Sequence, residues 1–258
     1  MPAMSTIDID HTHRFTDRAD YYAAFRPAYP DAVLGCLYRD AGLNPQAVVV
    51  DVGSGTGLSS ELFLRHGHAV IGVEPNAAMR HAAERALRHY PNFQSIAGKA
   101  ELIPLADACA GAAVSASAFH WFSAVEARAE FRRILKPQGV AILMGNARSK
   151  DASPFMRAYD NVIRTYSEIT PAHQNRDERV RAFLASSTGI SSRTVEYLEL
   201  LDLREFLGRT LSYSATPLAG QDGHHDMVRD LERIFTAAAE RGRILYHGQV
   251  TLQWSRLG

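Results

Sequence analysis

Cysteine is scarce in this chain, which has only Cys36 and Cys109 among its 258 residues. Two cysteines cannot form the disulfide framework of a small secreted domain, and they fit a reducing cytoplasm. No apolar run approaches the ~18 residues that a membrane span requires. The first fifteen residues are polar and acidic and lack the apolar core of a secretory signal. We therefore expect a cytoplasmic protein.

An excess of either charge is also missing, since 28 basic side chains balance 28 acidic ones. A net charge of zero provides no bulk positive field to hold a nucleic-acid backbone or an anionic membrane. The composition, 46% hydrophobic and 22% charged, is that of an ordinary globular protein. We expect a small-molecule substrate and neither nucleic acid nor membrane as partner. The sequence leaves the oligomeric state open.

Strand and helix patterns alternate in the first part of the chain. Apolar runs at 47–52, 69–74, 112–118 and 140–144 predict buried strands, and segments with helical periodicity separate them. This order predicts right-handed βαβ units and a doubly wound parallel sheet.

The pattern changes after about residue 150. Ser153 followed by Pro154 begins one predicted helix, Asp202 with Glu205 begins another as a capping box, and a third spans 227–238. Strands are predicted between and after these helices. We expect a single domain over 1–258, divided into an N-terminal lid (1–45), a core (46–147), and cap helices with the last strands (148–258).

The strongest functional motif is the glycine-rich loop Asp51–Gly57, between the first predicted strand and helix. Glycines let a backbone approach a ligand closely, and the helix N-terminus offers free amides. Glu74 ends the next strand, 23 residues after Asp51, a spacing that lets a carboxylate reach a ribose diol. The combination predicts a nucleoside-containing ligand.

The glycine order distinguishes two candidate nucleosides. A dinucleotide fingerprint requires a third glycine where Leu58 stands, and this loop instead reads D-x-G-x-G-x-G. The Asp51 carboxylate would repel a pyrophosphate but can receive an ammonium group. S-adenosylmethionine, which carries an amino acid zwitterion, therefore fits better than NAD.

The sequence resembles the class I S-adenosylmethionine-dependent methyltransferases, in their type 11 small-molecule group. The resemblance rests on the loop and Glu74 and on the segments 19–30, 73–76, 98–105, 118–122, 131–139 and 208–214. It implies a Rossmann-like, mostly parallel seven-stranded sheet in an α/β fold, with a helical cap over the C-terminal edge. It also implies a transferase that uses S-adenosylmethionine as cofactor to methylate a small-molecule acceptor.

Individual residues take roles from this resemblance and from their own chemistry and position. Glu101 stands where the adenine amine is received, and Arg26 can pair with the cofactor carboxylate. His120 and Tyr22 are the catalytic candidates, although His120 and Trp121 can equally serve only as walls of the adenosine pocket. The expected cofactor-binding residues are Tyr22, Arg26, Asp51, Gly53, Ser54, Gly55, Gly57, Glu74, Pro75, Met79, Ala100, Glu101, Ser117, Phe119, His120 and Trp121.

Two histidine groups could suggest a metal. His11 and His13 stand near Asp8 and Asp10, and the run 224–226 reads His-His-Asp. Neither offers ligands at a metal-binding spacing, so we expect no metal.

Three other functions stay open at this stage. A sulfonium has three electrophilic carbons, so a cyclase could close azetidine-2-carboxylate from the cofactor alone and release methylthioadenosine. An NAD(P)-dependent oxidoreductase is disfavoured by Asp51 and Leu58. A nucleotide-binding module without catalysis would bind the cofactor without turnover. Gly111, Ser117 and Gln138 depart from the family pattern, so the acceptor cannot be inherited from relatives.

Overall fold

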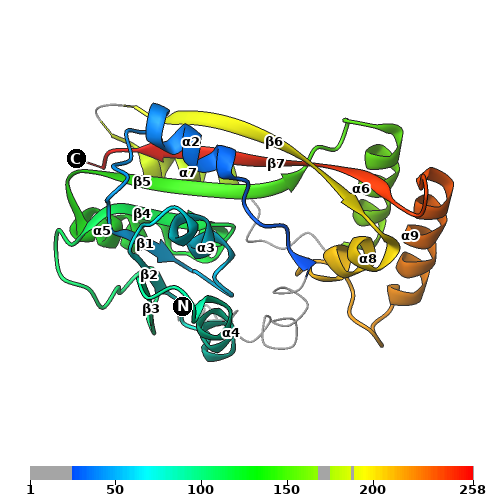
Figure 1. Cartoon of the computed structure of the whole chain (residues 1–258), viewed down its shortest axis with the longest axis horizontal. Coiled ribbons are helices and arrows are strands. Elements are labelled where there is room, and N and C mark those ends of the chain that lie inside the picture. Colours follow the sequence, from blue (N-terminus) through cyan, green and yellow to red (C-terminus); the bar gives the residue numbers. More distant parts are fainter. Residues whose placement is uncertain (1–24, 168–174, 187–188, 258) are drawn as a thin grey trace, which may run out of the picture.

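The computed structural model describes residues 25–167, 175–186 and 189–257, and its centre is a seven-stranded sheet of order β3-β2-β1-β4-β5-β7-β6 (Figure 1). β1 to β5 run parallel, and β7 lies antiparallel to both β5 and β6. The predicted doubly wound, mostly parallel α/β sheet is confirmed. The strands are β1 (Val49–Val52), β2 (Val70–Val73), β3 (Phe93–Ile96), β4 (Ala110–Ala116), β5 (Leu135–Arg148), β6 (Ser191–Leu201) and β7 (Ile244–Ser255).

Helices cover both faces of the sheet. Successive residues of a strand point to opposite faces, so Val49 packs with α2 and α3 whereas Val50 packs with α5 and α7. All four residues of β1 are buried, as expected for a central parallel strand. The helices in these layers are α2 (Asp31–Asp40), α3 (Leu58–Arg65), α4 (Ala77–Leu87), α5 (Ala124–Ile134) and α7 (Arg176–Leu184).

A separate helical cluster forms the cap. Figure 1 shows α6 (Pro154–Tyr166), α8 (Leu203–Leu211) and α9 (His224–Ala238) together beyond the carboxyl end of β5. They share an apolar core with Leu201, the last residue of β6, and with Tyr246, near the start of β7. The two predicted helix starts are confirmed, because Ser153 caps α6 and the reciprocal Asp202–Glu205 capping box begins α8.

Three elements were not foreseen. β3 lies at the edge of the sheet, and none of its four residues is fully buried, so its sequence lacks a strong strand pattern. α2 falls in the segment assigned only as a lid. α7 places Val180, Phe183 and Leu184 among charged residues, which hides its apolar face in the sequence.

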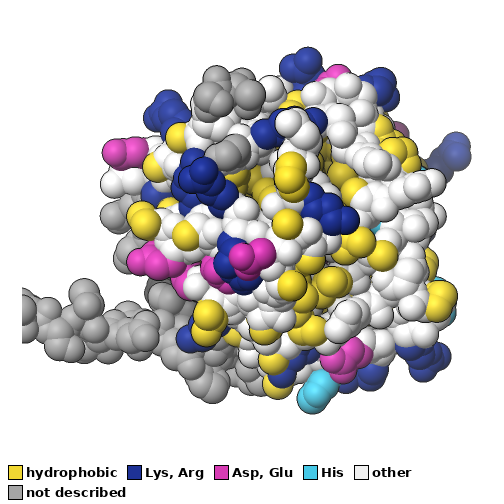
Figure 2. All heavy atoms as spheres, turned by 90° about the vertical axis from the view of Figure 1, so that its left-hand side faces the viewer, with side chains coloured by type: hydrophobic (Ala, Val, Ile, Leu, Met, Phe, Trp, Pro, Cys, Tyr) yellow, Lys and Arg dark blue, Asp and Glu magenta, His cyan; other side chains and the backbone are white. Residues whose placement is uncertain are grey.

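The end of the molecule opposite the cap carries charges of both signs. Figure 2 shows lysine and arginine side chains there together with acidic and apolar ones.

Within the described ranges, no helix is long and apolar enough to cross a membrane.

Candidate functional site

A hollow lies at the carboxyl ends of the central strands. With its mouth included it measures about 410 Å³. β1 and β4 are neighbours whose following helices cover opposite faces, and ligands of open α/β sheets bind at such a switch point. The lining residues are Arg26, Pro27, Tyr29, Gly53, Ser54, Gly55, Thr56, Leu58, Ser59, Ala116, Ser117 and Asn146.

The glycine loop forms one wall of the hollow. Gly53 has a φ of +72°, and a Cβ there would lie 2.6 Å from the Cβ of Ala118, so the loop packs against the end of β4 only without a side chain. Gly55 has a φ of +55°, but a Cβ there would meet no heavy atom within 4 Å. Because Gly55 lines the hollow, that open space is where a ligand can approach the backbone.

Asp51 lies behind this wall and is fully buried. Its Oδ2 accepts hydrogen bonds from the Ser59 and Ser60 hydroxyls at 2.6 and 2.7 Å, whereas its Oδ1 has no partner among the described residues. Burial raises the pKa of the Asp51 carboxyl, and the two serine hydroxyls oppose that rise. The Oγ1 of Thr56, also buried, is likewise without a partner in the described part of the chain. Buried polar atoms require partners, so both atoms fit a polar ligand at the loop.

Glu74 follows β2 and holds the loop in place. Its Oε2 accepts a hydrogen bond from the Gly55 amide at 3.0 Å, and its Oε1 accepts one from the Asn76 amide at 2.9 Å. Burial raises the pKa of this carboxyl, while the two amides oppose that rise. A carboxylate offers about four acceptor positions, so Glu74 retains capacity for ligand hydroxyls. The loop and the predicted ribose-binding acid thus form one unit.

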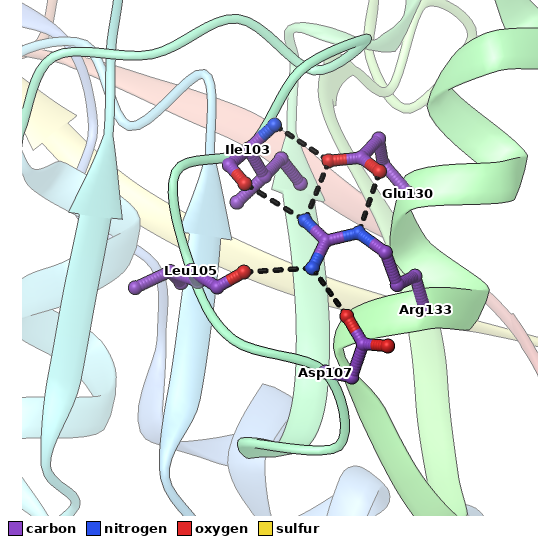
Figure 3. A network of polar contacts seen from close by, with 5 residues as sticks. All are labelled: Ile103, Leu105, Asp107, Glu130 and Arg133. Carbon is purple, nitrogen blue, oxygen red and sulfur yellow. Dashed lines mark hydrogen bonds and ion pairs between the residues drawn. The ribbon is translucent and has the colours of Figure 1, made fainter.

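The segment expected to bracket adenine is anchored to α5. Figure 3 shows Arg133 donating to both carboxylate oxygens of Glu130, to the carbonyl oxygens of Ile103 and Leu105, and to Asp107, at 2.7 to 2.8 Å. Glu130 also accepts a hydrogen bond from the Ile103 amide at 2.7 Å. Every nitrogen of the guanidinium therefore has a partner, which fixes the backbone after Glu101.

The predicted site residues separate into three groups. Arg26, Gly53, Ser54, Gly55 and Ser117 line the hollow. Tyr22 lies outside the described residues. The others do not line the hollow. They lie in β1, in α4 or in the segments that follow β1, β2, β3 and β4, namely Asp51, Gly57, Glu74, Pro75, Met79, Ala100, Glu101, Phe119, His120 and Trp121.

His120 lies on the short helix η2 (Phe119–Trp121) after β4. Its ring centroid is 4.7 Å from that of Trp121, and its backbone carbonyl accepts a hydrogen bond from Arg179 at 3.2 Å. Glu101 reaches the same region, because its Oε1 accepts a hydrogen bond from the Ser123 amide at 2.7 Å. His120 and Glu101 therefore both belong to the region that follows β4, next to Ser123.

Sequence reasoning missed several lining residues. Thr56, Leu58 and Ser59 continue the glycine loop into α3, so the motif itself could have included them. Asn146 lies near the end of β5, and the rule that ligands bind at the carboxyl ends of parallel strands could have identified it. Tyr29 lies in the segment 19–30 that carries the family resemblance, so that segment could have identified it as a lining residue.

The histidine groups show no metal-binding arrangement where the structure describes them. Across the described ranges, no three His, Cys, Asp or Glu side chains cluster as metal ligands. His224 directs its Nδ1 to the Pro217 carbonyl oxygen at 3.1 Å. His11 and His13 lie outside the described residues, so the absence of a metal stays a prediction.

Sequence comparison finds methyltransferase relatives. The family model described as "Methyltransferase domain" matches residues 50–143. An uncharacterized methyltransferase-like protein of Schizosaccharomyces pombe is 30% identical over 61% of this chain and 60% of its own length. The malonyl-[acyl-carrier protein] O-methyltransferase of Geobacter sulfurreducens is 33% identical over 67% of this chain and 66% of its own length. The matches thus span 60% and 66% of the length of these two curated relatives.

Solved structures share the fold. A protein of Anaeromyxobacter dehalogenans assigned as a type II methyltransferase has a TM-score of 0.66 and 21% identity, covering 91% of this chain and 99% of that one. A protein of Anabaena variabilis assigned as a methyltransferase from an antibiotic biosynthesis pathway has a TM-score of 0.55 and 18% identity, covering 85% and 96%. At such identities the similarity concerns the fold.

Proposed function

We propose, because this chain belongs to the class I methyltransferase domain family, that it transfers the methyl group of S-adenosylmethionine to a small-molecule acceptor. The observation that carries the proposal is the hydrogen bond that joins Glu74 to Gly55 beside the hollow. This hydrogen bond brings the carboxylate that is predicted to bind the ribose and the glycine loop together at the switch point of the sheet.

The residues of the chain fit the groups of this cofactor. Asp51 has an unpartnered buried oxygen behind the loop, which suits an ammonium group reached directly or through water. Glu74 keeps free lone pairs for the ribose hydroxyls. Glu101 and the anchored backbone after it suit the adenine amine, and Arg26 at the hollow's wall suits the carboxylate.

Methyl transfer requires little further chemistry from the protein. S-adenosylmethionine supplies, when bound, an electrophilic methyl group on its sulfonium. The chain contributes the orientation of the reactants and the exclusion of water, and a base for an acceptor that must lose a proton. His120 and Tyr22 are the proposed bases.

The acceptor is proposed to be a small molecule in the cytoplasm. The zero net charge supports this class over nucleic acid. An oxygen nucleophile is among the acceptors to test, because one relative is named as an O-methyltransferase.

The test follows the fate of the labelled methyl group. The purified protein is incubated with methyl-labelled S-adenosylmethionine, with and without an extract of small metabolites, and the nucleoside products are separated. We expect S-adenosylhomocysteine and a labelled small molecule only when the extract is present. If methylthioadenosine forms without extract, the protein is a cyclase and the proposed methyl transfer is wrong. If no extract gives any turnover, the protein is a binding module without catalysis.

A further inference from the structure

Arg179 of α7 donates hydrogen bonds to two backbone carbonyl groups of the segment after β4. Its Nη1 donates to the His120 carbonyl oxygen at 3.2 Å, and its Nη2 donates to the Phe122 carbonyl oxygen at 2.6 Å. Its guanidinium carbon also lies 5.6 Å from the ring centroid of Phe119. One side chain of α7 therefore contacts η2 and the residue that follows it at three points.

The apolar face of α7 fixes the position of Arg179. Phe183 stands four residues after Arg179, so the two side chains are neighbours on one side of the helix. The ring of Phe183 is buried and packs on those of Phe119 and Phe131, with centroids 4.8 and 5.0 Å apart. Arg179 therefore extends toward η2 from a helix that is anchored in the core shared with α5.

The Phe122 carbonyl belongs to the same peptide group as the Ser123 amide. That amide donates a hydrogen bond to Glu101 Oε1 at 2.7 Å. A trans peptide group is planar, and its C=O and N–H point in opposite directions, so a contact that fixes one of them also fixes the other. Arg179 and Glu101 are thus connected through one rigid group.

This connection matters because the contact between Ser123 and Glu101 is open to water. Ser123 is exposed and Glu101 is only half-buried, so water competes for their hydrogen bond. The hydrogen bond from Arg179 to Phe122 is partly buried and restrains the peptide group from its other side. A cation at the carbonyl and an anion at the N–H also polarise the peptide group in the same direction.

The contact with Ser123 leaves one oxygen of Glu101 for a ligand. Oε1 receives the Ser123 amide, and Oε2 accepts no hydrogen bond from any described residue. Under the proposed function, on which this inference rests, Glu101 receives the exocyclic amine of adenine. A carboxylate oxygen accepts a hydrogen bond from an amino group and repels an oxo group, so its direction decides how well the two purines are distinguished.

We propose that Arg179 is a positioning residue for recognition of the cofactor's base. Through the peptide group of Phe122 and Ser123 it sets the direction of the Glu101 carboxylate, and it thereby determines how strongly the protein prefers a 6-aminopurine to a 6-oxopurine. Arg179 does not contact the cofactor in this account. Base preference is thus assigned to α7, a helix outside the glycine loop and the two strands that carry the cofactor motifs.

The test compares two ligands that differ at the purine 6 position. Titration calorimetry of the full chain gives the Kd of S-adenosylhomocysteine and that of S-inosylhomocysteine, in which an oxo group replaces the amine. The ratio of the two Kd values measures base preference. We expect the unmodified protein to bind S-adenosylhomocysteine about ten-fold or more tightly, and Glu101→Gln to lose most of this preference, because an amide can face either purine.

Variants of Arg179 separate positioning from stability. Arg179→Met removes both hydrogen bonds, and we expect it to reduce the preference several-fold. Arg179→Lys keeps the charge and can reach one carbonyl, so its preference should be intermediate. A merely structural role would weaken both ligands equally and leave the ratio unchanged. Arg181→Met, at an exposed position of α7, is the matched control and should keep the full preference.

Ser123→Pro tests the peptide group itself. Ser123 has a φ of −73°, and Phe122 has φ and ψ of −81° and 150°, values that suit a proline and the residue before it. The substitution therefore removes the N–H that Glu101 accepts without straining the backbone. Ser123→Ala, which loses only the hydroxyl that donates to Glu126, is the control. We expect Ser123→Pro to reduce the preference as Arg179→Met does, and the double variant to show no further reduction.

Each other outcome contradicts the proposal. If the unmodified protein binds both ligands equally, Glu101 does not receive the amine. If Arg179→Met and Ser123→Pro keep the full preference, Arg179 has a structural role alone. Should Arg179→Met not fold, a full preference in both Arg179→Lys and Ser123→Pro is equally contradictory. Failure of the unmodified protein to bind S-adenosylhomocysteine would instead refute the proposed function.

Discussion

The Gly55 amide donates a hydrogen bond of 3.0 Å to Oε2 of Glu74, and this contact joins the loop after β1 to the acid after β2. Glu74 therefore has two roles in our account. It stabilises the loop in the ligand-free protein, and it offers its remaining lone pairs to the ribose hydroxyls of the cofactor.

Replacing this acid should affect binding more than folding. We expect Glu74→Ala to weaken S-adenosylhomocysteine by about 1–3 kcal/mol, because ligand hydroxyls and the Gly55 amide lose a charged acceptor. Isothermal titration calorimetry measures the change. Glu84→Ala, at an exposed position of α4, is the control and should bind as the unmodified protein does. Equal affinities for the two variants would show that the ribose site lies elsewhere.

Two glycines allow backbone strain to be separated from ligand contact. Gly55 and Gly67 both have positive φ values, +55° and +86°, and a Cβ at either would meet no heavy atom within 4 Å. We expect Gly55→Val to abolish cofactor binding, because its side chain would occupy the hollow. Gly67→Val should lower the melting temperature, because valine is strained at a positive φ there as well, but it should leave the Kd of S-adenosylhomocysteine unchanged. Retained binding in Gly55→Val would mean that no ligand approaches this loop.

The buried Asp51 predicts a pH dependence of stability. Its pKa is raised by burial in the folded protein, so the folded state holds the proton to higher pH than the unfolded chain does. The stability linked to this group is present below the ordinary aspartate pKa of about 3.9 and is lost as pH rises through the higher folded value.

Asp51→Asn should remove that loss. We expect the free energy of unfolding of the ligand-free variant to fall less than that of the unmodified protein as pH rises through this window. Its affinity for S-adenosylhomocysteine should drop, since a neutral amide replaces the carboxylate that receives the ammonium. Urea unfolding across a pH series, paired with calorimetry, measures both. Identical pH profiles would show that Asp51 is not responsible.

The Arg133 anchor gives a further prediction for the adenine segment. Arg133→Lys loses the paired hydrogen bonds to Glu130 and most of those to the backbone at 103–105. We expect a loss of about 1–3 kcal/mol in the free energy of unfolding and a several-fold weaker cofactor affinity. Arg132→Lys, exposed on the same helix, is the control. Lost stability with unchanged cofactor affinity would assign the anchor to folding alone.

The sequence predicted the parts of the site that depend on short-range order. The loop 51–57 and Glu74 follow adjacent strands, so their meeting could be inferred from spacing and strand order alone. The hydrogen bond from the Tyr197 hydroxyl of β6 to Asn146 of β5 could not. It depends on the register of β5, β7 and β6 and on the absence of a side chain at Gly248, neither of which a single sequence reveals.

Element prediction failed where burial is partial. β3 has no fully buried residue and pairs on one side only, so neither alternation nor a continuous apolar run marks it. α7 buries three apolar side chains between arginines and acids, and the charges obscured its helical pattern. Central strands such as β1, buried along their whole length, were predicted because their environment allows only apolar residues at most positions.

Titration calorimetry of the purified chain with S-adenosylhomocysteine tests the central claim most directly. The account predicts one-to-one binding with a Kd of about 1–100 µM, no heat with NAD, and no binding by Gly55→Val. NAD binding more tightly than S-adenosylhomocysteine, or neither ligand binding a folded protein, would contradict it.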